Sequence, residues 1–274
     1  MKTINCKGKL IDLSHPKVMG IVNVTPDSFY DGGKLKTDND ILFQVEKMLL
    51  DEATFIDLGG YSSRPSADDV SENEELNRVL PAIELILKNF PETLISIDTF
   101  RSAVAKKSVE TGAAIINDIS AGFLDEQMMD IAAQLQVPYL MMHMRGNPKT
   151  MQSLTDYKNV VQEVLFYFSE RIATARKKGI NDLIIDPGFG FSKTTEQNYE
   201  VLSNLELFQK NELPVLVGLS RKSMIYKMLK TSSKESLTGT ISLNTIALLK
   251  GASILRVHDV KEAVECIKLV ENLT

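Results

Sequence analysis

The sequence has few cysteines, no long apolar run and no excess of positive charge. Each of these absences argues against a class of protein. Its 274 residues include two cysteines, Cys6 and Cys266, near opposite ends of the chain and outside any CxxC or Cys/His pattern. Two isolated cysteines fit free thiols in a reducing compartment better than a disulfide framework or a cysteine-bound metal. We therefore expect a cytoplasmic location.

Hydropathy and charge exclude two further classes. No run approaches the ~18 apolar residues that a membrane-spanning helix needs, and the N-terminal MKTINCKGKL has no apolar core of the kind found in signal peptides. The net charge is −5. Because nucleic-acid backbones demand a basic face, we expect no nucleic-acid partner and no membrane association, although a local cationic pocket stays compatible with this charge.

A regular alternation of apolar runs and helix-like segments fills most of the chain. Residues 2–14 alternate weakly around Lys7-Gly8-Lys9 and predict a short β-hairpin or arm. The strands expected after it are 18–24, 55–58, 94–98, 114–118, 138–142, 183–185, 215–219 and 254–257. The helices expected between and after them are 39–52, 72–87, 101–111, 126–135, 158–178, 195–208, 222–230, 237–249 and 260–271. Spacings such as Val160, Val164, Phe168 and Ile172 indicate amphipathic helices.

This pattern predicts a parallel α/β fold. The strand-like runs are apolar throughout rather than alternating, as expected of parallel strands that are buried on both faces. No break in composition divides the chain. Because eight strand–helix units in one chain of 274 residues suit a closed barrel better than an open sheet, we predict an α/β fold of the (β/α)8 TIM-barrel class, with residues 1–274 forming one domain.

Polar or ionisable residues close all eight strand-like runs. In a (β/α)8 barrel the active site lies where the carboxyl ends of the strands meet, so these residues are expected to converge. In chain order they are Asn23, Asp57, Asp98, Asn117 with Asp118, His143, Asp186, Ser220 to Lys222, and Arg256 with His258. The alternative is that they are only the solvated starts of loops.

Two groups of these residues differ in their chemistry. Asp98, Asn117 and Asp186 form an acidic and amide group that suits a flat heterocycle displaying N–H donors and one or two acceptors. The alternative is that they are satisfied polar groups at the barrel rim. The cationic group suits a phosphate, which barrels often bind at their seventh and eighth strands, and its alternative is a solvated basic loop. Its members are Ser220, Arg221, Lys222, Arg256 and His258.

Four further residues have less certain roles. Asn23 is a candidate Mg²⁺ anchor, because this ion prefers oxygen ligands, retains waters and often bridges substrate phosphates. Phe29 either excludes water as part of a lid or anchors its loop in the core. Arg64 is a third cation, or forms a salt bridge within its loop. We leave His143 without a role and favour a structural one over a catalytic one.

Eight motifs along nearly the whole chain resemble those of the dihydropteroate synthase family. In order they read NVTPDSFYDGG, DLGGYSSRP, IDT, NDIS, MHMRGNPKTMQ, DPGFGF, GLSRKSMI and RVHDV. The resemblance implies a (β/α)8 barrel in the folate pathway that condenses 6-hydroxymethyl-7,8-dihydropterin pyrophosphate with 4-aminobenzoate, giving 7,8-dihydropteroate and pyrophosphate. It also implies Mg²⁺ as cofactor, sulfonamides as competitors for aminobenzoate, and a homodimer formed through helices late in the barrel.

Carried over position by position, the resemblance implies roles for individual residues. Asp98, Asn117, Asp186 and Lys222 would hold the pterin ring, while Asn23, Arg256 and His258 would hold pyrophosphate, with Asn23 on the metal. The catalytic set would be Asp98, Asp186, Lys222, Arg256 and His258. Two loops would close over the site and shape the aminobenzoate pocket, which the resemblance assigns to Phe29, Ser62, Ser63, Arg64, Pro65 and Ser223.

The chain departs from the family pattern at a few loop positions, and two other functions compete with the synthase. Tyr61 stands where the family commonly has Glu, and Tyr30, Ser63, Ser66 and Tyr226 also differ. These departures affect the aminobenzoate pocket and sulfonamide response rather than the reaction. A pterin-binding methyltransferase would need no combined anion and metal site. A non-catalytic pterin-binding relative would be expected to lose Asn23, Lys222 or Arg256.

Overall fold

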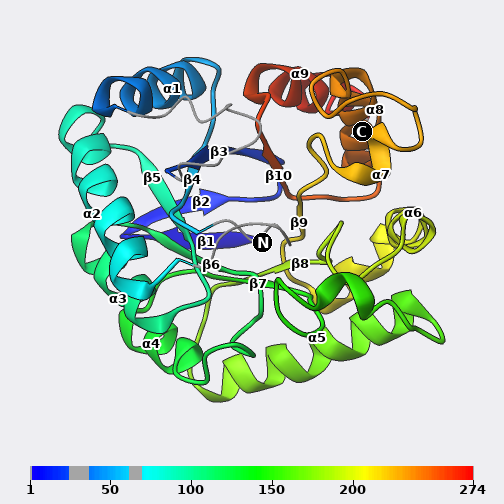
Figure 1. The fold of residues 1–274 in the computed structure, drawn as a ribbon, viewed down its shortest axis with the longest axis horizontal. Coiled ribbons are helices and arrows are strands. Elements are labelled where there is room, and N and C mark those ends of the chain that lie inside the picture. Colours follow the sequence, from blue (N-terminus) through cyan, green and yellow to red (C-terminus); the bar gives the residue numbers. More distant parts are fainter. Residues whose placement is uncertain (1, 25–36, 62–69, 274) are drawn as a thin grey trace.

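A ring of parallel strands surrounded by helices dominates the computed structural model, which describes residues 2–24, 37–61 and 70–273 (Figure 1). The strands are β3 (Lys17–Asn23), β4 (Phe55–Gly59), β5 (Leu94–Asp98), β6 (Ile115–Asp118), β7 (Tyr139–Met142), β8 (Leu183–Asp186), β9 (Leu216–Val217) and β10 (Ile254–Val257). Their order is β8-β7-β6-β5-β4-β3-β10-β9. A parallel bridge between Ile185 and Val215 joins β8 to the residue before β9 and closes the ring. The predicted (β/α)8 barrel is confirmed.

The helices follow the expected alternation with the strands. They are α1 (Asp38–Leu50), α2 (Glu72–Asn89), α3 (Ser102–Thr111), α4 (Met128–Leu135), α5 (Val160–Lys177), α6 (Thr195–Ser203), α7 (Ser223–Tyr226), α8 (Leu237–Leu249) and α9 (Val260–Val270), with 3₁₀ turns at Met151–Ser153 and Leu205–Asn211. Thr37 and Thr194 begin α1 and α6 with capping boxes. Within the described ranges, no helix is both long and apolar enough to cross a membrane.

Two expected helices are shorter than the sequence pattern predicts. The α-helix expected over 195–208 ends at Ser203 and continues as a 3₁₀ segment. Asn204 interrupts it, because its side chain donates to the carbonyl of Glu200 and thereby competes with regular helix bonding. The helix expected over 222–230 is the single turn α7. The chain turns there, with Lys230 at a φ of 54° and the Thr231 amide bonded to the carbonyl of Tyr226.

Side chains of the barrel strands alternate between the helices and the barrel interior. Outward residues such as Ile97, Ile185 and Val257 are fully buried in the core between strands and helices. Inward residues near the amino ends of the strands form a second, apolar cluster with Met19, Phe55, Ile115, Leu140, Ile184, Leu216 and Ile254. Two residues further along the same strands, the inward positions are Ile21, Asp57, Asn117, Met142, Asp186, Gly218 and Arg256. The interior is therefore apolar at one end and largely polar at the other.

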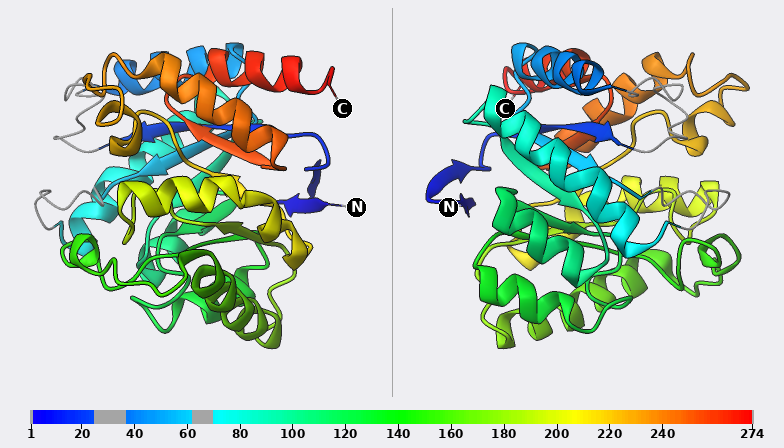
Figure 2. Two further views of the ribbon diagram at one scale, coloured as in Figure 1. Left: turned by 90° about the vertical axis from the view of Figure 1, so that its right-hand side faces the viewer. Right: turned by 60° about the vertical axis from the view of Figure 1, so that its left-hand side comes forward.

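An N-terminal hairpin covers the apolar end of the barrel. Strands β1 (Thr3–Cys6) and β2 (Lys9–Asp12) pair antiparallel through a two-residue turn, Lys7-Gly8, in which both φ angles are positive. Its side chains Ile4, Cys6, Ile11 and Leu13 belong to the same buried cluster as the lower inward residues. Figure 2 shows the hairpin at one end of the barrel. The predicted hairpin is confirmed, and it leaves only the opposite end of the barrel open.

Candidate active site

Arg256 connects two strand carboxylates at the open end of the barrel. Its Nε donates to Asp57 Oδ2 over 2.6 Å, and its Nη2 donates to Asp98 Oδ2 over 2.7 Å. The Asp57 side chain is fully buried, whereas those of Arg256 and Asp98 are about one fifth exposed, at 21% and 22%. The three residues stand on β4, β5 and β10, so a single guanidinium ties together strands that are far apart in sequence. It lies partly open to a ligand.

The electrostatics of this group follow from burial and mutual charge. Burial raises the pKa of Asp98 to about 7, opposed by Arg256 and reinforced by the neighbouring Asp57. Burial by itself would lower the pKa of Arg256, but Asp57 and Asp98 together raise it above its usual range. Arg256 is therefore a permanent cation, while Asp98 is poised to exchange a proton near neutral pH.

Asn117 extends this network along β6. Its Nδ2 donates to both carboxylate oxygens of Asp57, over 3.2 and 3.1 Å, and the residue is 4% exposed. The Asn117 side-chain oxygen stays available as an acceptor from a ligand. The neighbouring Asp118 is different, because its carboxylate accepts from Ser120, Gly122 and Tyr139 and is fully buried. Of the pair, Asn117 faces the site and Asp118 shapes the loop.

Asp186, at the end of β8, and Lys222, in the loop after β9, interact electrostatically. Burial raises the pKa of Asp186, and Lys222 opposes that rise. Burial lowers the pKa of Lys222 to about 8, and Asp186 opposes that fall. Both groups are thus drawn toward neutral pH by loss of water, while each favours the charged form of the other. Together they provide an acceptor and a donor.

The loop between Asp186 and Phe191 shapes the surroundings of Lys222. Asp186 Oδ1 accepts from the Gly188 amide over 2.8 Å, and Lys222 Nζ donates to the Phe189 carbonyl. Gly190 has a φ of +81°, and a Cβ there would stand 3.3 Å from Lys222 Cδ. The Phe191 ring centroid lies 5.0 Å from Lys222 Nζ, a cation–π contact. Reading only the strand ends misses Phe191. The Phe189-Gly190-Phe191 sequence shortly after Asp186 was the available signal for an aromatic ring near the site.

Arg221, one of the cationic residues predicted from strands seven and eight, is bonded within its own loop. Arg221 is 9% exposed and forms a two-bond pair with Asp259, with Nε–Oδ2 and Nη2–Oδ1 distances of 2.8 Å each. Its Nη1 also donates to the carbonyls of Ser233 and Lys234. These bonds favour a structural role for Arg221 in the loop. The other ionisable members of that group are Arg256, Lys222 and His258.

His258 is oriented by Ser220. The His258 Nδ1 and Ser220 Oγ atoms are 3.0 Å apart, and the His258 amide donates to the same hydroxyl over 3.3 Å. Ser223, the first residue of α7, is partly exposed next to Lys222. The two contacts between Ser220 and His258 indicate that Ser220 positions the imidazole of His258.

Asn23 ends β3 at the same open end. It is paired in register with Gly59, and Gly59 is paired with Asp98. A Cβ on Gly59 would stand 3.7 Å from Asn23 Oδ1 and 3.6 Å from Asp98 Cβ, so the absence of a side chain at Gly59 leaves room between them. In the described part of the chain, no three His, Cys, Asp or Glu side chains gather as a metal site. The predicted site residues Phe29, Ser62, Ser63, Arg64 and Pro65 lie outside the described residues.

Strand-end reasoning names Asp57 as the end of the second run but assigns it to neither chemical group of the site. The apolar run over 55–58 suggests that Asp57 closes a strand, but it is the central residue of β4. Its inward direction follows from Phe55, two residues earlier, which belongs to the interior cluster. An ionisable residue in the middle of an apolar run was the available sequence signal that Asp57 faces a functional site. Asp57 holds Arg256 and Asn117 together from beneath the open surface.

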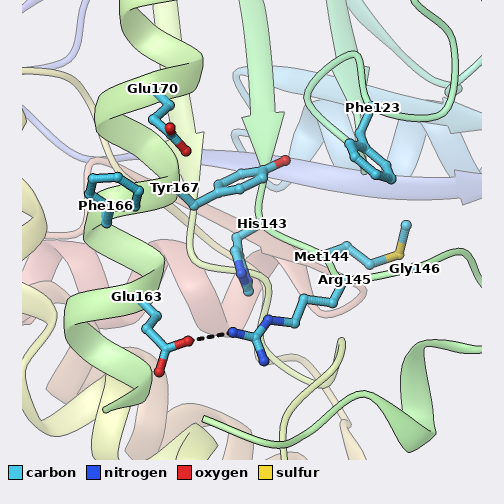
Figure 3. Close-up of a pocket in the computed structure, with 9 residues that line it drawn as sticks. All are labelled: Phe123, His143, Met144, Arg145, Gly146, Glu163, Phe166, Tyr167 and Glu170. Carbon is cyan, nitrogen blue, oxygen red and sulfur yellow. Dashed lines mark hydrogen bonds and ion pairs between the residues drawn. The ribbon is translucent and has the colours of Figure 1, made fainter. Parts of the chain in front are cut away.

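A separate cavity of about 330 Å³ lies beside His143, away from these strand-end groups (Figure 3). Its lining residues are Phe123, His143, Met144, Arg145, Gly146, Glu163, Phe166, Tyr167 and Glu170. None of the described residues predicted to bind substrate lines it. His143 is 2% exposed, and burial, followed by the charges of Lys193 and Arg145, holds its pKa well below the usual range. These features favour a structural role for His143.

Comparison with known proteins decides the family. Residues 19–258 match the profile of the family described as pterin binding enzyme. The chain belongs to this family. It is 47% identical over 267 residues to dihydropteroate synthase of Escherichia coli K12, covering 97% of this chain and 94% of that protein. The predicted pterin-binding residues therefore belong to a chain whose relatives include dihydropteroate synthases.

Solved structures agree along the whole chain. The Yersinia pestis dihydropteroate synthase with a sulfonamide drug complex superposes with a TM-score of 0.95 at 41% identity, covering 99% of this chain and 98% of that one. The Xanthomonas albilineans enzyme in complex with 7,8-dihydropteroate gives a TM-score of 0.88 at 35% identity, covering 99% and 98%. Membership in the dihydropteroate synthases therefore rests on both sequence and fold.

Proposed function

We propose that this chain condenses 6-hydroxymethyl-7,8-dihydropterin pyrophosphate with 4-aminobenzoate, forming 7,8-dihydropteroate and pyrophosphate at the open end of the barrel. The observation that carries the proposal is the convergence of Asp57, Asp98, Asn117 and Arg256 in one hydrogen-bonded network. This network occurs in a chain that is nearly half identical to a synthase over almost its full length. Folate biosynthesis is the corresponding pathway.

The pterin ring would lie against Asp98, Asn117, Asp186 and Lys222. A pterin edge carries ring N–H and amino donors together with a carbonyl acceptor, so it matches carboxylates, an amide and an ammonium. The buried environment strengthens each of these hydrogen bonds relative to water. Burial raises the pKa values of Asp98, to about 7, and of Asp186. A ligand that donates hydrogen bonds would favour their ionised forms.

The pyrophosphate would lie against Asn23, Arg256 and His258. The carboxylate bonds of Arg256 use Nε and Nη2, so among the described residues Nη1 is left for a phosphate oxygen. Arg256 would then connect the two halves of the site, with carboxylates on one side of the guanidinium and phosphate on the other. Lys222, next to Asp186, lies on the pterin side of this division.

Asn23 is the residue that would hold Mg²⁺. One partly exposed amide oxygen fits this ion, because Mg²⁺ keeps several waters and takes its remaining ligands from substrate phosphates. When bound, Mg²⁺ would neutralise charge on the departing pyrophosphate. The protein itself supplies Arg256 for the same purpose, and the fixed geometry of its two carboxylate bonds needs no reorganisation during the reaction.

The reaction follows from these positions. The aminobenzoate nitrogen forms a bond to the pterin methylene carbon, the carbon–oxygen bond to pyrophosphate breaks, and the nitrogen releases a proton. The electron pair of the broken bond leaves with pyrophosphate, toward Arg256 and His258. If cleavage leads, positive charge on the methylene is stabilised by Asp98 and Asp186. Positioning and fixed charges would then provide the rate enhancement without a covalent enzyme intermediate.

The aminobenzoate pocket would involve Phe29, the Ser62 to Pro65 segment and Ser223. Ser223 supports this part of the proposal, because it is partly exposed directly after Lys222. Phe191 adds an aromatic wall on the same side, with its ring against the Lys222 ammonium. A sulfonamide complex of the Yersinia pestis enzyme makes drug competition a natural assay for this pocket. One domain over residues 1–274 and a cytoplasmic location belong to the same proposal.

A homodimer through the late helices is also proposed. Helix α8 is apolar on most of its positions, and a helix that is apolar all round is normally covered on every side. Ile246 and Leu249 on α8 are 40% and 55% exposed, and Met228 and Leu229 before it are 60% and 56% exposed. We expect Ile246→Glu to give a monomer by light scattering. Leu269→Glu, on exposed α9, is the control, and a monomeric wild type contradicts the dimer.

The decisive experiment compares two carboxylates at opposite ends of β8. Asp186→Asn should weaken binding of dihydropterin pyrophosphate about 10-fold to 100-fold in calorimetry, because it removes a charge-assisted acceptor. Asp182→Asn is the control, because Asp182 instead accepts from the Asn5 amide at the hairpin end. Equal affinity of Asp186→Asn and wild type contradicts the ring-binding role. Failure of the wild type to release pyrophosphate with both substrates contradicts the reaction.

A further inference from the structure

Lys193 is a buried lysine that the proposed reaction does not use. It lies between the loop after β8 and Thr194, the N-cap of α6, and is 5% exposed. Among residues 2–24, 37–61 and 70–273, no carboxylate lies within ion-pair distance of its ammonium; its hydrogen-bond partners are an imidazole and two carbonyls. A buried charge without a paired opposite charge opposes folding, and an apolar side chain of this length would pack without that cost.

The partners of Lys193 match an ammonium in number and kind. Nζ lies 2.9 Å from His143 Nδ1, 3.0 Å from the Gly188 carbonyl and 3.1 Å from the Phe191 carbonyl. Burial lowers the pKa of Lys193 to about 7, and Asp186 opposes that fall. In its ammonium form Lys193 has three N–H donors and no acceptor, so all three contacts are satisfied at once. His143 then accepts at Nδ1 and carries its own proton on Nε2. Lys193 and His143 thus fix each other's hydrogen-bonding roles.

His143 is a rigid acceptor. Its backbone amide donates to the Asp186 carbonyl over 2.9 Å, and its ring meets Tyr167 edge-to-face with centroids 4.9 Å apart. Figure 3 shows the imidazole between Tyr167 and the Arg145–Glu163 ion pair. A Cβ on Gly188 would stand 2.1 Å from the His143 carbonyl oxygen, so the loop after β8 packs directly on this residue. The acceptor and the loop are held in one fixed relation.

The two carbonyls bound by Lys193 enclose the part of the loop that contacts the pterin side of the site. Gly188 donates its amide to Asp186 Oδ1, and the Phe189 carbonyl, one residue later, accepts from Lys222. Phe191 places its ring against Lys222. Displacement of either carbonyl therefore moves a group that touches Asp186 or Lys222. The bonds of Lys193 act on the shape of the pterin side and not on that of Arg256 and His258.

We propose that Lys193 is a positioning residue: held by His143, it fixes the Gly188–Phe191 turn so that Asp186 and Lys222 are set for the pterin ring. This inference rests on the proposed function, since it assumes that these two residues bind pterin. It gives His143 a role, because the neutral imidazole accepts one of the three hydrogen bonds of Lys193. It also explains why a costly buried ammonium stands where packing alone would favour a hydrocarbon.

The test replaces Lys193 by methionine, which keeps the length of the side chain and removes all three donors. Binding of 6-hydroxymethyl-7,8-dihydropterin and of inorganic pyrophosphate with Mg²⁺ is measured separately by calorimetry, together with the unfolding midpoint. Lys193→Met should bind the pterin about tenfold more weakly, because misplaced contacts lose most of a charge-assisted hydrogen bond. Its pyrophosphate affinity should stay within about twofold, and its unfolding midpoint should not fall.

Two variants of His143 provide the matched control. His143→Gln keeps an acceptor oxygen for Lys193 and should retain pterin affinity within about threefold, whereas His143→Leu removes the acceptor and should resemble Lys193→Met. Unchanged pterin affinity in Lys193→Met overturns the positioning role. Parallel loss of both ligands with a lower unfolding midpoint overturns it as well, because it indicates a role in folding alone. Failure of the wild type to bind the pterin overturns the proposed function instead.

Discussion

The two ends of the barrel interior are built from the same eight strands but differ in chemistry. At the amino ends, inward residues such as Phe55, Leu140 and Ile184 are fully buried and pack against the hairpin. Two residues further along these strands stand Asp57, Met142 and Asp186. The hairpin end removes apolar surface from water and stabilises the fold. The open end contains buried charges that are only partly compensated, and some of its polar groups remain able to bond a ligand.

This difference implies that stability and activity are separable along a single strand. Buried ion pairs contribute little net stability, yet removal of one partner leaves the other uncompensated. Buried hydrocarbon contributes stability in proportion to its area and has no part in the chemistry. Isosteric substitutions at the open end should therefore reduce catalysis more than stability, and truncations at the hairpin end should do the reverse.

The largest expected effect is on Asp57. Asp57→Asn offers one acceptor oxygen where Asp57 now serves both Arg256 and Asn117, so the guanidinium should shift toward Asp98. We expect kcat/KM to fall at least ~100-fold, since small misplacements of a fixed charge cost this much. Steady-state kinetics with both substrates measure the change.

The matched control for Asp57 is Ser96, which is paired with it in register on β5. The Ser96 hydroxyl is buried and has no hydrogen-bond partner among the described residues. Ser96→Ala should therefore keep kcat/KM within about twofold and leave stability unchanged or slightly higher. Wild-type turnover in Asp57→Asn, or equal losses in the two variants, would contradict the network as the centre of the site.

At the hairpin end, Leu140→Ala should have the opposite signature. Leu140 is fully buried in the inward apolar cluster, so its truncation should lower the free energy of unfolding by about 3 kcal/mol. Turnover per folded molecule should stay within about twofold. Urea denaturation and kinetics on the same preparation measure both quantities. A loss of kcat/KM comparable to that of Asp57→Asn would show that the two ends are coupled.

The pH dependence of stability should report the strain at the open end. Burial raises the pKa of Asp98 to about 7, so the folded protein binds a proton that the unfolded chain has already lost above about pH 4. The contribution of Asp98 to the free energy of unfolding therefore declines as pH rises from about 4 to 7 and is constant above that range. Urea denaturation across this range should show a flatter profile in Asp98→Asn. An unchanged profile would assign the proton uptake to another group.

Much of this arrangement is predictable from the sequence, because apolar runs and their polar ends are local features. The runs ending at Asn23, Asp98 and Asp186 place three site residues correctly on their strands. Arg221 cannot be assigned in this way, since its pairing with Asp259 depends on how two loops meet. Asp57 is named as a strand end but receives no role for a related reason, because it gains Arg256 as a partner only when β10 packs next to β3, the neighbour of β4.

The pattern of departures from the family also becomes interpretable only in three dimensions. Tyr61 is one of the positions at which the sequence was expected to depart from the family. Its ring packs edge-to-face on Phe100, with centroids 5.1 Å apart, and lies 5.3 Å from the Arg101 guanidinium carbon. Arg101 keeps a carboxylate partner in the buried Glu75. A cation–π contact thus accompanies the ion pair at this position. The sequence alone shows Tyr61 but not its contact with the Arg101 guanidinium.

The smallest expected effect lies in the hairpin turn, where Gly8 has a φ of +87° and a Cβ would meet nothing within 4 Å. Gly8→Ala should therefore cost only the backbone strain of a left-handed residue, about 1 kcal/mol in the free energy of unfolding, with kinetics unchanged. Gly179→Ala, at a φ of +86° with equally open surroundings, is the matched control and should lose a similar amount. A markedly larger loss in Gly8→Ala would mean that the turn sets the packing of the whole hairpin end, and any fall in kcat/KM would mean that this packing reaches the open end.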